Sequence, residues 1–190
     1  MFSIDFKNIH SEDRLREHLQ AHNVSFQAVP HEYGGPAALA AYQAHLVFPY
    51  QPSTMSLYEL LVAGIVSVLP SPDFYEHLLS TGVLEVHPFG QMDVVRHIPG
   101  WQEYMDWYHS DFEGLFVYFD SWEQLKTLQQ TFDFPAQRRR VVGKMEGYST
   151  AIVHEWARYL STVPPARHPH QRFSDGYPHK YRIESTVADI

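Results

Sequence analysis

The chain has 190 residues, a formal net charge of −8 and no cysteine. Its length supports one ordinary domain with a sizeable core, and its acidic balance argues against nucleic acid as a partner, because phosphate backbones bind basic surfaces. The missing cysteines exclude disulfides and thiolate chemistry. No apolar run could cross a bilayer, and residues 1–7 lack the plan of a secretory signal. We therefore expect a cytosolic chain if Met1 is its true start, and otherwise a fragment.

The first half of the chain is predicted to alternate strands with helices. Hydrophobic spacing, prolines and glycine stops place these elements as follows: a helix over 12–22 capped by Ser11, a strand over 24–29, a turn over 31–36, a short helix over 36–43, a strand over 44–48, a helix over 53–63 capped by Ser53 and ended by Gly64, a strand over 65–69, and a helix over 72–81. This alternation indicates an α/β fold, a Rossmann-like parallel sheet flanked by helices.

The second half is predicted to be less regular. Residues 83–114 are expected to form loops and short helices, followed by a strand over 115–119 and a helix over 122–132. A long amphipathic helix should then run over 136–160, since its apolar residues recur at helical spacing. We expect one Rossmann-like domain over residues 1–162 and an extended tail, rich in Pro, His and Arg, over 163–190.

Two polar turns, 31–36 and 50–54, follow predicted strands and should lie at the carboxyl edge of the sheet, where such folds bind ligands. Hydroxyls and backbone N–H groups at a helix start suit a phosphate, which makes Ser53 and Thr54 candidates. Glu59, further along the same helix, could hold a ribose diol. Tyr50 and Gln51 end the preceding strand, beside the expected ligand.

Each of these residues also has a structural interpretation. Ser53 and Thr54 are typical helix caps, and Glu59 could be a solvated or paired surface residue. Gly34 and Gly35 could admit a base or sugar closely, or could serve a turn that needs positive φ. Tyr50 could instead point into the core.

The same residues resemble a known family. The runs that carry the likeness are Tyr-Gly-Gly-Pro at 33–36, Pro-Tyr-Gln at 49–51, Ser-Thr-Met-Ser-Leu-Tyr-Glu at 53–59, Gly64, Pro-Ser at 70–71, Tyr-Met-Asp-Trp-Tyr at 104–108, Phe-Val-Tyr-Phe-Asp-Ser-Trp at 116–122 and Leu-Lys at 125–126. Over residues 8–160 the chain resembles the C-terminal, donor-binding half of a GT-B glycosyltransferase. The nearest likeness is to uncharacterised glycosyltransferase-like proteins of fungi and algae.

The resemblance implies a domain that binds a nucleoside diphosphate sugar for glycosyl transfer to an acceptor hydroxyl, with no cofactor and no metal. It assigns the ribose contact to Glu59, and the donor site to Gly34, Gly35, Tyr50, Gln51, Ser53, Thr54, Ser56 and Glu59. The family's other acidic position, seven residues before Glu59, is Pro52 here. The acceptor-binding half is absent, so catalysis would need an N-terminal half or a partner chain. The alternative is a non-catalytic nucleotide-binding or protein-interaction module.

Other chemistries find less support in the sequence. His168, His170 and His179 cluster in the tail without the spacing of a helical metal site, so we expect no metal. Neither a nucleophile elbow nor a phosphate-binding P-loop motif is present. The runs at 106–108 and 120–122 could shape a sugar subsite through their aromatic rings, or could be core residues and a helix cap.

Overall fold

The computed structural model describes residues 1–30, 34–86 and 95–162. In chain order its elements are β1 (Phe2–Ile4), α1 (Glu12–Ala21), β2 (Phe26–Ala28), α2 (Pro36–Leu39), β3 (His45–Leu46), α3 (Met55–Val62), β4 (Ser67–Pro70), α4 (Pro72–Ser80), the 3₁₀ helices η1 (Trp101–Tyr104) and η2 (Ser110–Phe112), β5 (Val117–Phe119), α6 (Trp122–Thr131) and α7 (Phe134–Thr162). The chain divides into two compact units, Met1–Thr150 and Ala151–Ile190, and α7 runs from the first into the second.

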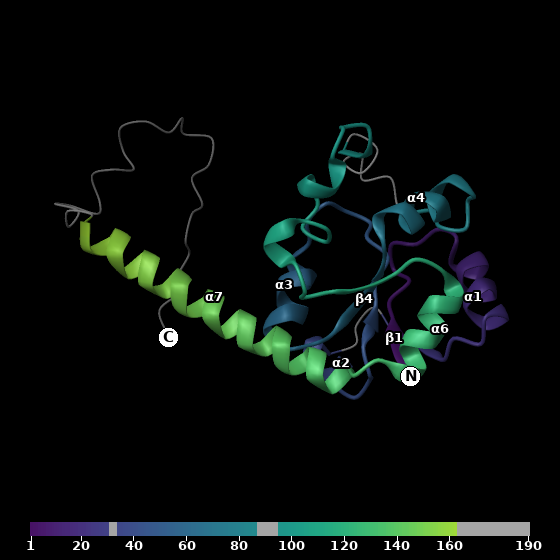
Figure 1. Ribbon diagram of the computed structural model, residues 1–190, viewed down its shortest axis with the longest axis horizontal. Helices are drawn as coiled ribbons and strands as arrows, with labels where there is room; N and C mark the ends of the chain where they lie inside the picture. Colours follow the sequence, from purple (N-terminus) through teal and green to yellow (C-terminus); the bar gives the residue numbers. More distant parts are fainter. Residues whose placement is uncertain (31–33, 87–94, 163–190) are drawn as a thin grey trace, which may run out of the picture. The chain divides into compact units, whose positions relative to one another are not determined.

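The first unit is built on a five-stranded sheet in the order β2-β1-β3-β4-β5, with every neighbouring pair parallel. Helices cover both faces, as Figure 1 shows, so the predicted α/β class is confirmed. On one side α1, α4 and α6 meet, since the rings of His18 and Phe74 lie 5.7 and 5.4 Å from that of Trp122. On the other side Leu39 of α2 packs with Leu60 of α3.

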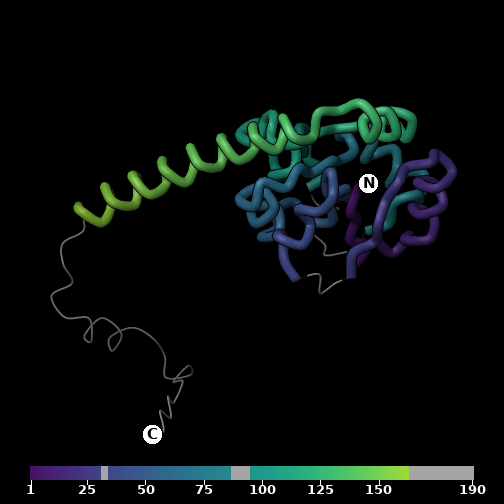
Figure 2. The backbone as a smooth tube through the Cα atoms, turned by 90° about the horizontal axis from the view of Figure 1, so that it is seen from below, coloured from purple at the N-terminus to yellow at the C-terminus, as the bar shows by residue number. Residues whose placement is uncertain are grey.

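The core lies between these layers and is almost entirely apolar. Phe2 and Ile4 of β1, Leu15 of α1 and Leu61 of α3 are all fully buried. The start of α7 completes the core, because the ring of Phe134 packs edge-on against Phe2 at 5.6 Å. Figure 2 follows the same chain path from a second direction.

Strand β1 is the largest departure from the predicted elements, because no strand was expected before residue 24. It lies between β2 and β3, with Ser3 paired to Gln27 on one side and to His45 on the other. Strands at the centre of a parallel sheet are buried on both faces. The short run Phe-Ser-Ile meets that demand with two apolar residues and one small hydroxyl.

Three helices differ from prediction, one in its cap and two in their bounds. The hydroxyl of Ser11 does not cap α1, because it donates to the carbonyl of Val83 at 2.9 Å and accepts from the N–H of Glu85 at 2.7 Å. Helix α7 begins at Phe134 rather than at 136, since the carboxylate of Asp133 accepts the N–H of Ala136 at 2.9 Å. The expected helix over 36–43 is only one turn long, from Pro36 to Leu39.

Candidate functional site

The strand order fixes where a ligand would bind. The chain passes from β1 to β2 in one direction across the sheet, and from β3 to β4 and β5 in the other. The point of reversal therefore lies between β1 and β3. In open parallel sheets, ligands bind outside the carboxyl ends of the strands at such a reversal, because the loops diverge there and leave a crevice.

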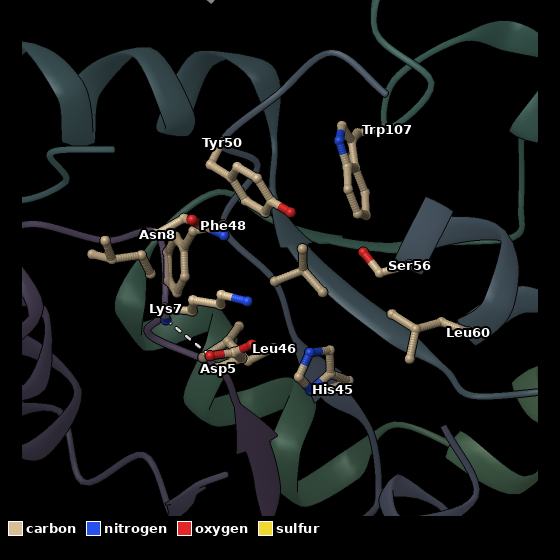
Figure 3. A pocket seen from close by; sticks show the side chains of 12 residues that line it. Asp5, Lys7, Asn8, His45, Leu46, Phe48, Tyr50, Ser56, Leu60 and Trp107 are labelled. Atoms are coloured by element: carbon tan, nitrogen blue, oxygen red, sulfur yellow. Dashed lines mark hydrogen bonds between the residues drawn. The ribbon is translucent and has the colours of Figure 1, made fainter. Parts of the chain in front are cut away.

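A pocket of about 220 Å³ occupies this position. We call it the switch-point pocket. Figure 3 shows its walls, which come from the loop after β1, from β3 and the loop after it, from α3 and from the loop before β5. Its lining comprises Asp5, Lys7, Asn8, Ile9, His45, Leu46, Val47, Phe48, Tyr50, Ser56, Leu60 and Trp107. Aromatic faces beside hydroxyl, amide and charged groups suit a polar ring-shaped ligand.

A row of three polar side chains crosses the central strands at the level of His45. Ser3 pairs with His45, and His45 pairs with Ser67, so all three project from the same side of the sheet. The Oγ of Ser3 lies 3.0 Å from Nδ1 of His45. Burial lowers the pKa of His45 to about 4, while the charge of Asp5 and a hydrogen bond with the backbone of Ser3 act to raise it. The imidazole is therefore neutral near pH 7.

Ser67, at the end of this row, lacks a hydrogen bond for its hydroxyl among the described residues. Its side chain is 1% exposed. Buried hydroxyls are nearly always hydrogen-bonded, so an orphaned one is a cost to stability. The polar row is thus not explained by packing alone.

The lining of the pocket also includes two charges of opposite sign, on Asp5 and Lys7, and the phenol of Tyr50. Asp5 accepts the backbone N–H of Lys7 at 2.9 Å, which holds the loop after β1 in a tight turn. Tyr50 projects into the same pocket (Figure 3). Burial and the charge of Asp5 both raise the pKa of Tyr50, so its hydroxyl stays protonated and can donate a hydrogen bond.

At the start of α3 the structure corrects the predicted cap. Thr54 is the N-cap, with its Oγ1 accepting the N–H of Leu57 at 3.3 Å, and the helix begins at Met55. Ser53, expected to cap, is exposed and its hydroxyl bonds to the phenol of Tyr58. The Oγ of Ser56 lies 3.0 Å from Oγ1 of Thr54 and faces the switch-point pocket. Ser56 is therefore the hydroxyl that α3 presents to the pocket.

Helix α3 separates the predicted site residues into two groups. Tyr50 and Ser56 line the switch-point pocket, whereas Glu59 is exposed and lines a shallow hollow on another side of the helix with Pro36 and Ala37. Gly34 and Gly35, which precede this hollow, have φ of 81° and 84°, and the space around both is open. The predicted turn at 31–36 lies outside the described residues for its first three positions.

Two further predictions concern the loops around the site. Gln51 contributes its carbonyl, which accepts the indole N–H of Trp107 at 2.9 Å. Trp107 is 2% exposed and so is largely a core residue whose edge reaches the pocket. Ser121 caps α6 by accepting the N–H of Gln124 at 3.1 Å, which confirms the capping interpretation of that run.

Four polar residues of the pocket were missed: Asp5, Lys7, Asn8 and His45. Trp107 belongs to the run at 106–108, for which a sugar subsite was one interpretation. Asp5, Lys7 and Asn8 follow β1, and recognising β1 would have placed them at the carboxyl edge with Tyr50. The apolar-polar alternation over residues 2–6 is the signal that was available. The inward direction of His45 and Trp107 follows from sheet register and loop packing, which no local pattern encodes.

Among the residues described, no group of three or more His, Asp or Glu side chains is arranged to hold a metal ion. The tail histidines lie outside those residues. None of the described helices combines the length and apolarity that a bilayer span requires. Comparison of the chain with protein-family models, with curated proteins and with solved structures finds no match.

Proposed function

We propose that the chain is a glycosyltransferase-type donor domain that binds a nucleoside diphosphate sugar at the carboxyl edge of its sheet. The observation that carries the proposal is the switch-point pocket, whose position between β1 and β3 is where nucleotide-binding α/β folds hold their ligands. The resemblance of residues 33–59 to donor-binding sequences supports the same ligand class.

In this proposal the ligand lies across the first turn of α3. The pocket volume of about 220 Å³ is below the roughly 300–1,000 Å³ of sites that enclose a drug-sized ligand. The pocket therefore takes only the glycosyl portion of the ligand, and the nucleotide lies outside it. The diphosphate lies over the helix start, beside the hydroxyl of Ser56 and within the field of the Lys7 ammonium. The ribose reaches the other side of the helix, where Glu59 borders the hollow with Pro36.

The chemistry follows from this placement. As the glycosidic bond to phosphate breaks, negative charge grows on the diphosphate, and the positive end of the α3 dipole with Lys7 stabilises it. An acceptor hydroxyl, positioned by an N-terminal half or a partner chain, forms the new bond to the anomeric carbon and gives its proton to the leaving diphosphate. In that arrangement this chain supplies donor binding and leaving-group stabilisation.

Calorimetry with uridine and guanosine diphosphates tests the proposal. The parent should bind one of them, and Glu59→Gln should lower that affinity by about tenfold, the loss expected for one hydrogen bond to a charged group. Glu17→Gln, an exposed glutamate on α1, is the matched control and should bind like the parent. Failure of the parent to bind either nucleotide, or equal binding by Glu59→Gln, would contradict the proposal.

A second function, a non-catalytic interaction module, is favoured by one observation in the second unit. Along α7 the side chains of Ile152, Trp156 and Tyr159 are 56–60% exposed. They recur at positions i, i+4 and i+7, which is the spacing of a helix face that binds another surface. Sedimentation of the full chain tests this function, since self-association lost in Trp156→Glu would favour it and a monomeric parent would oppose it.

A further inference from the structure

His45 is the buried titratable group of the switch-point pocket, and only one side of its ring is bonded. Its side chain is 7% exposed, and Nδ1 lies 3.0 Å from Oγ of Ser3. Within the described residues Nε2 has no hydrogen-bond partner, although the ring lines the cavity beside Asp5 and Lys7 (Figure 3). A buried imidazole nitrogen that faces a pocket can form a hydrogen bond with a ligand in that pocket.

The surroundings of Ser3 decide which hydrogen bond this is. The hydroxyl of Ser3 donates to the carbonyl of Ala44 at 3.4 Å, so its oxygen is left to accept from the ring. The ring's bond with the Ser3 backbone favours the protonated imidazole, which means that the ring donates it. The contact between Nδ1 and the oxygen of Ser3 therefore places the hydrogen on Nδ1. In a neutral histidine the other nitrogen, Nε2, then carries a lone pair.

We infer that Nε2 of His45 accepts a hydrogen bond from a hydroxyl group of the ligand, and that the switch-point pocket thereby selects a glycosyl group over a second phosphate. The ligand's identity rests on the function proposed above. A hydroxyl can donate to a bare nitrogen, whereas an ionised phosphate has only acceptors.

The residue thus acts as a specificity determinant rather than as a base. The environment that buries the ring keeps it neutral near pH 7, and so keeps Nε2 an acceptor. The glycosyl group would gain a contact that the nucleotide alone does not make. Affinity for the sugar nucleotide, and not for the nucleotide, is therefore the quantity that depends on His45.

Calorimetry on the full chain separates these contributions. The probes are UDP with UDP-glucose, and GDP with GDP-mannose, applied to the parent, His45→Leu and His45→Gln. His45→Leu should weaken sugar-nucleotide binding by about fivefold to tenfold, as one lost hydrogen bond predicts, and leave nucleotide binding within twofold. His45→Gln, which keeps an acceptor near the Nε2 position, should recover most of the loss. Equal weakening of both ligands, or none, would overturn the inference.

A second measurement does not need the variants to fold. Long-range ¹H–¹⁵N NMR of the histidine ring in the parent chain reports which nitrogen carries the hydrogen, and should show the Nδ1–H form. The Nε2–H form would refute the inference whatever the ligand. If the parent binds neither nucleotide, the proposed function fails, and titration with free glucose and mannose then decides the inference: an Nε2 shift supports it and an unchanged Nε2 opposes it.

Discussion

Two neighbouring regions of the sheet's carboxyl edge carry similar polar and aromatic side chains. Those near β4 and β5 hold the backbone together, whereas those near β1 and β3 line a pocket. Around β4 and β5, three phenols each donate to a backbone carbonyl: Tyr75 of α4 to Pro49 at 2.6 Å, Tyr108 to Pro70 at 3.0 Å and Tyr118 of β5 to Trp107 at 2.6 Å. Beyond β1 and β3, hydroxyl, imidazole and amide groups face a cavity. We call the three phenols, with Trp101 and Trp107, the aromatic clasp.

The difference separates side chains whose hydrogen bonds hold loops and strands together from side chains that line a pocket. In the aromatic clasp the three phenols and the indole of Trp107 each donate to a backbone carbonyl, and the rings pack together, with Trp101 5.6 Å from Tyr108. Such a region is rigid and has little left to offer a ligand. The switch-point pocket shares Trp107 with the clasp, and the ring of His45 lines the same pocket.

The largest expected effect is on the clasp itself. Trp101→Ala should destabilise the fold by about 3–5 kcal/mol, because a large buried ring leaves a cavity against Tyr75 and Tyr108. The free energy of unfolding in urea measures this. Tyr104→Ala, an aromatic residue of the same 3₁₀ helix that is 59% exposed, should cost much less. Equal losses in both would mean that the clasp is not a structural unit.

The next effect concerns His45 and acid. Its pKa falls from 6.5 to about 4 on folding, so the unfolded chain takes up the proton first as the pH drops. Stability from this group is complete above pH 6.5 and is lost as the pH falls through 4, by about 3 kcal/mol in all. Urea unfolding between pH 7 and 4 should show this loss in the parent and in His77→Gln, an exposed histidine, but not in His45→Gln. Parallel curves would place His45 in a solvated setting.

Removing one phenol from the clasp should have a moderate effect. Tyr118→Phe deletes the bond to the carbonyl of Trp107 and should cost about 1–2 kcal/mol, because that carbonyl is left without its partner. Tyr42→Phe, whose hydroxyl has no bond among the described residues, is the matched control and should change the unfolding free energy by less than about 0.5 kcal/mol. A neutral Tyr118→Phe would remove the contrast between the two edges.

The smallest effect should be a gain. Ser67→Ala removes a buried hydroxyl that has no partner in the described part of the chain, and should stabilise the fold by about 1 kcal/mol. Ser3→Ala, in the same row, should do the reverse, since it removes the oxygen bonded to His45. Thermal melts of the two variants beside the parent give the comparison. A destabilised Ser67→Ala would show that this hydroxyl is satisfied in solution.

Much of the fold could be predicted from local sequence, because the signals were local. Pro72 after Ser71, and Ser121 before Trp122, mark helix starts that the structure confirms to within a residue. Gly64 ends α3 with φ of 67°, a conformation that glycine adopts freely. The α/β class followed from the alternation of these elements.

The site was harder to predict because it depends on pairing between distant segments. The alternation over residues 2–6 is a local signal for β1, but it does not show that this strand pairs between β2 and β3 and so brings Asp5 and Lys7 to the pocket. The polar turn before α3 was located correctly, but which of its hydroxyls faces the cavity depends on helix phase, and that is set by Thr54 as the cap. The roles proposed for Glu59 and Ser56 stay predictions for the binding experiments.

Strand β1 has one practical consequence for handling the protein. All five strands run in the same direction, so the residue that enters β1 lies at the amino edge of the sheet, opposite the pocket. Anything joined ahead of Phe2, such as an affinity handle, therefore starts on the far side from the binding edge. Immobilising the chain through such a handle leaves the pocket facing the solution.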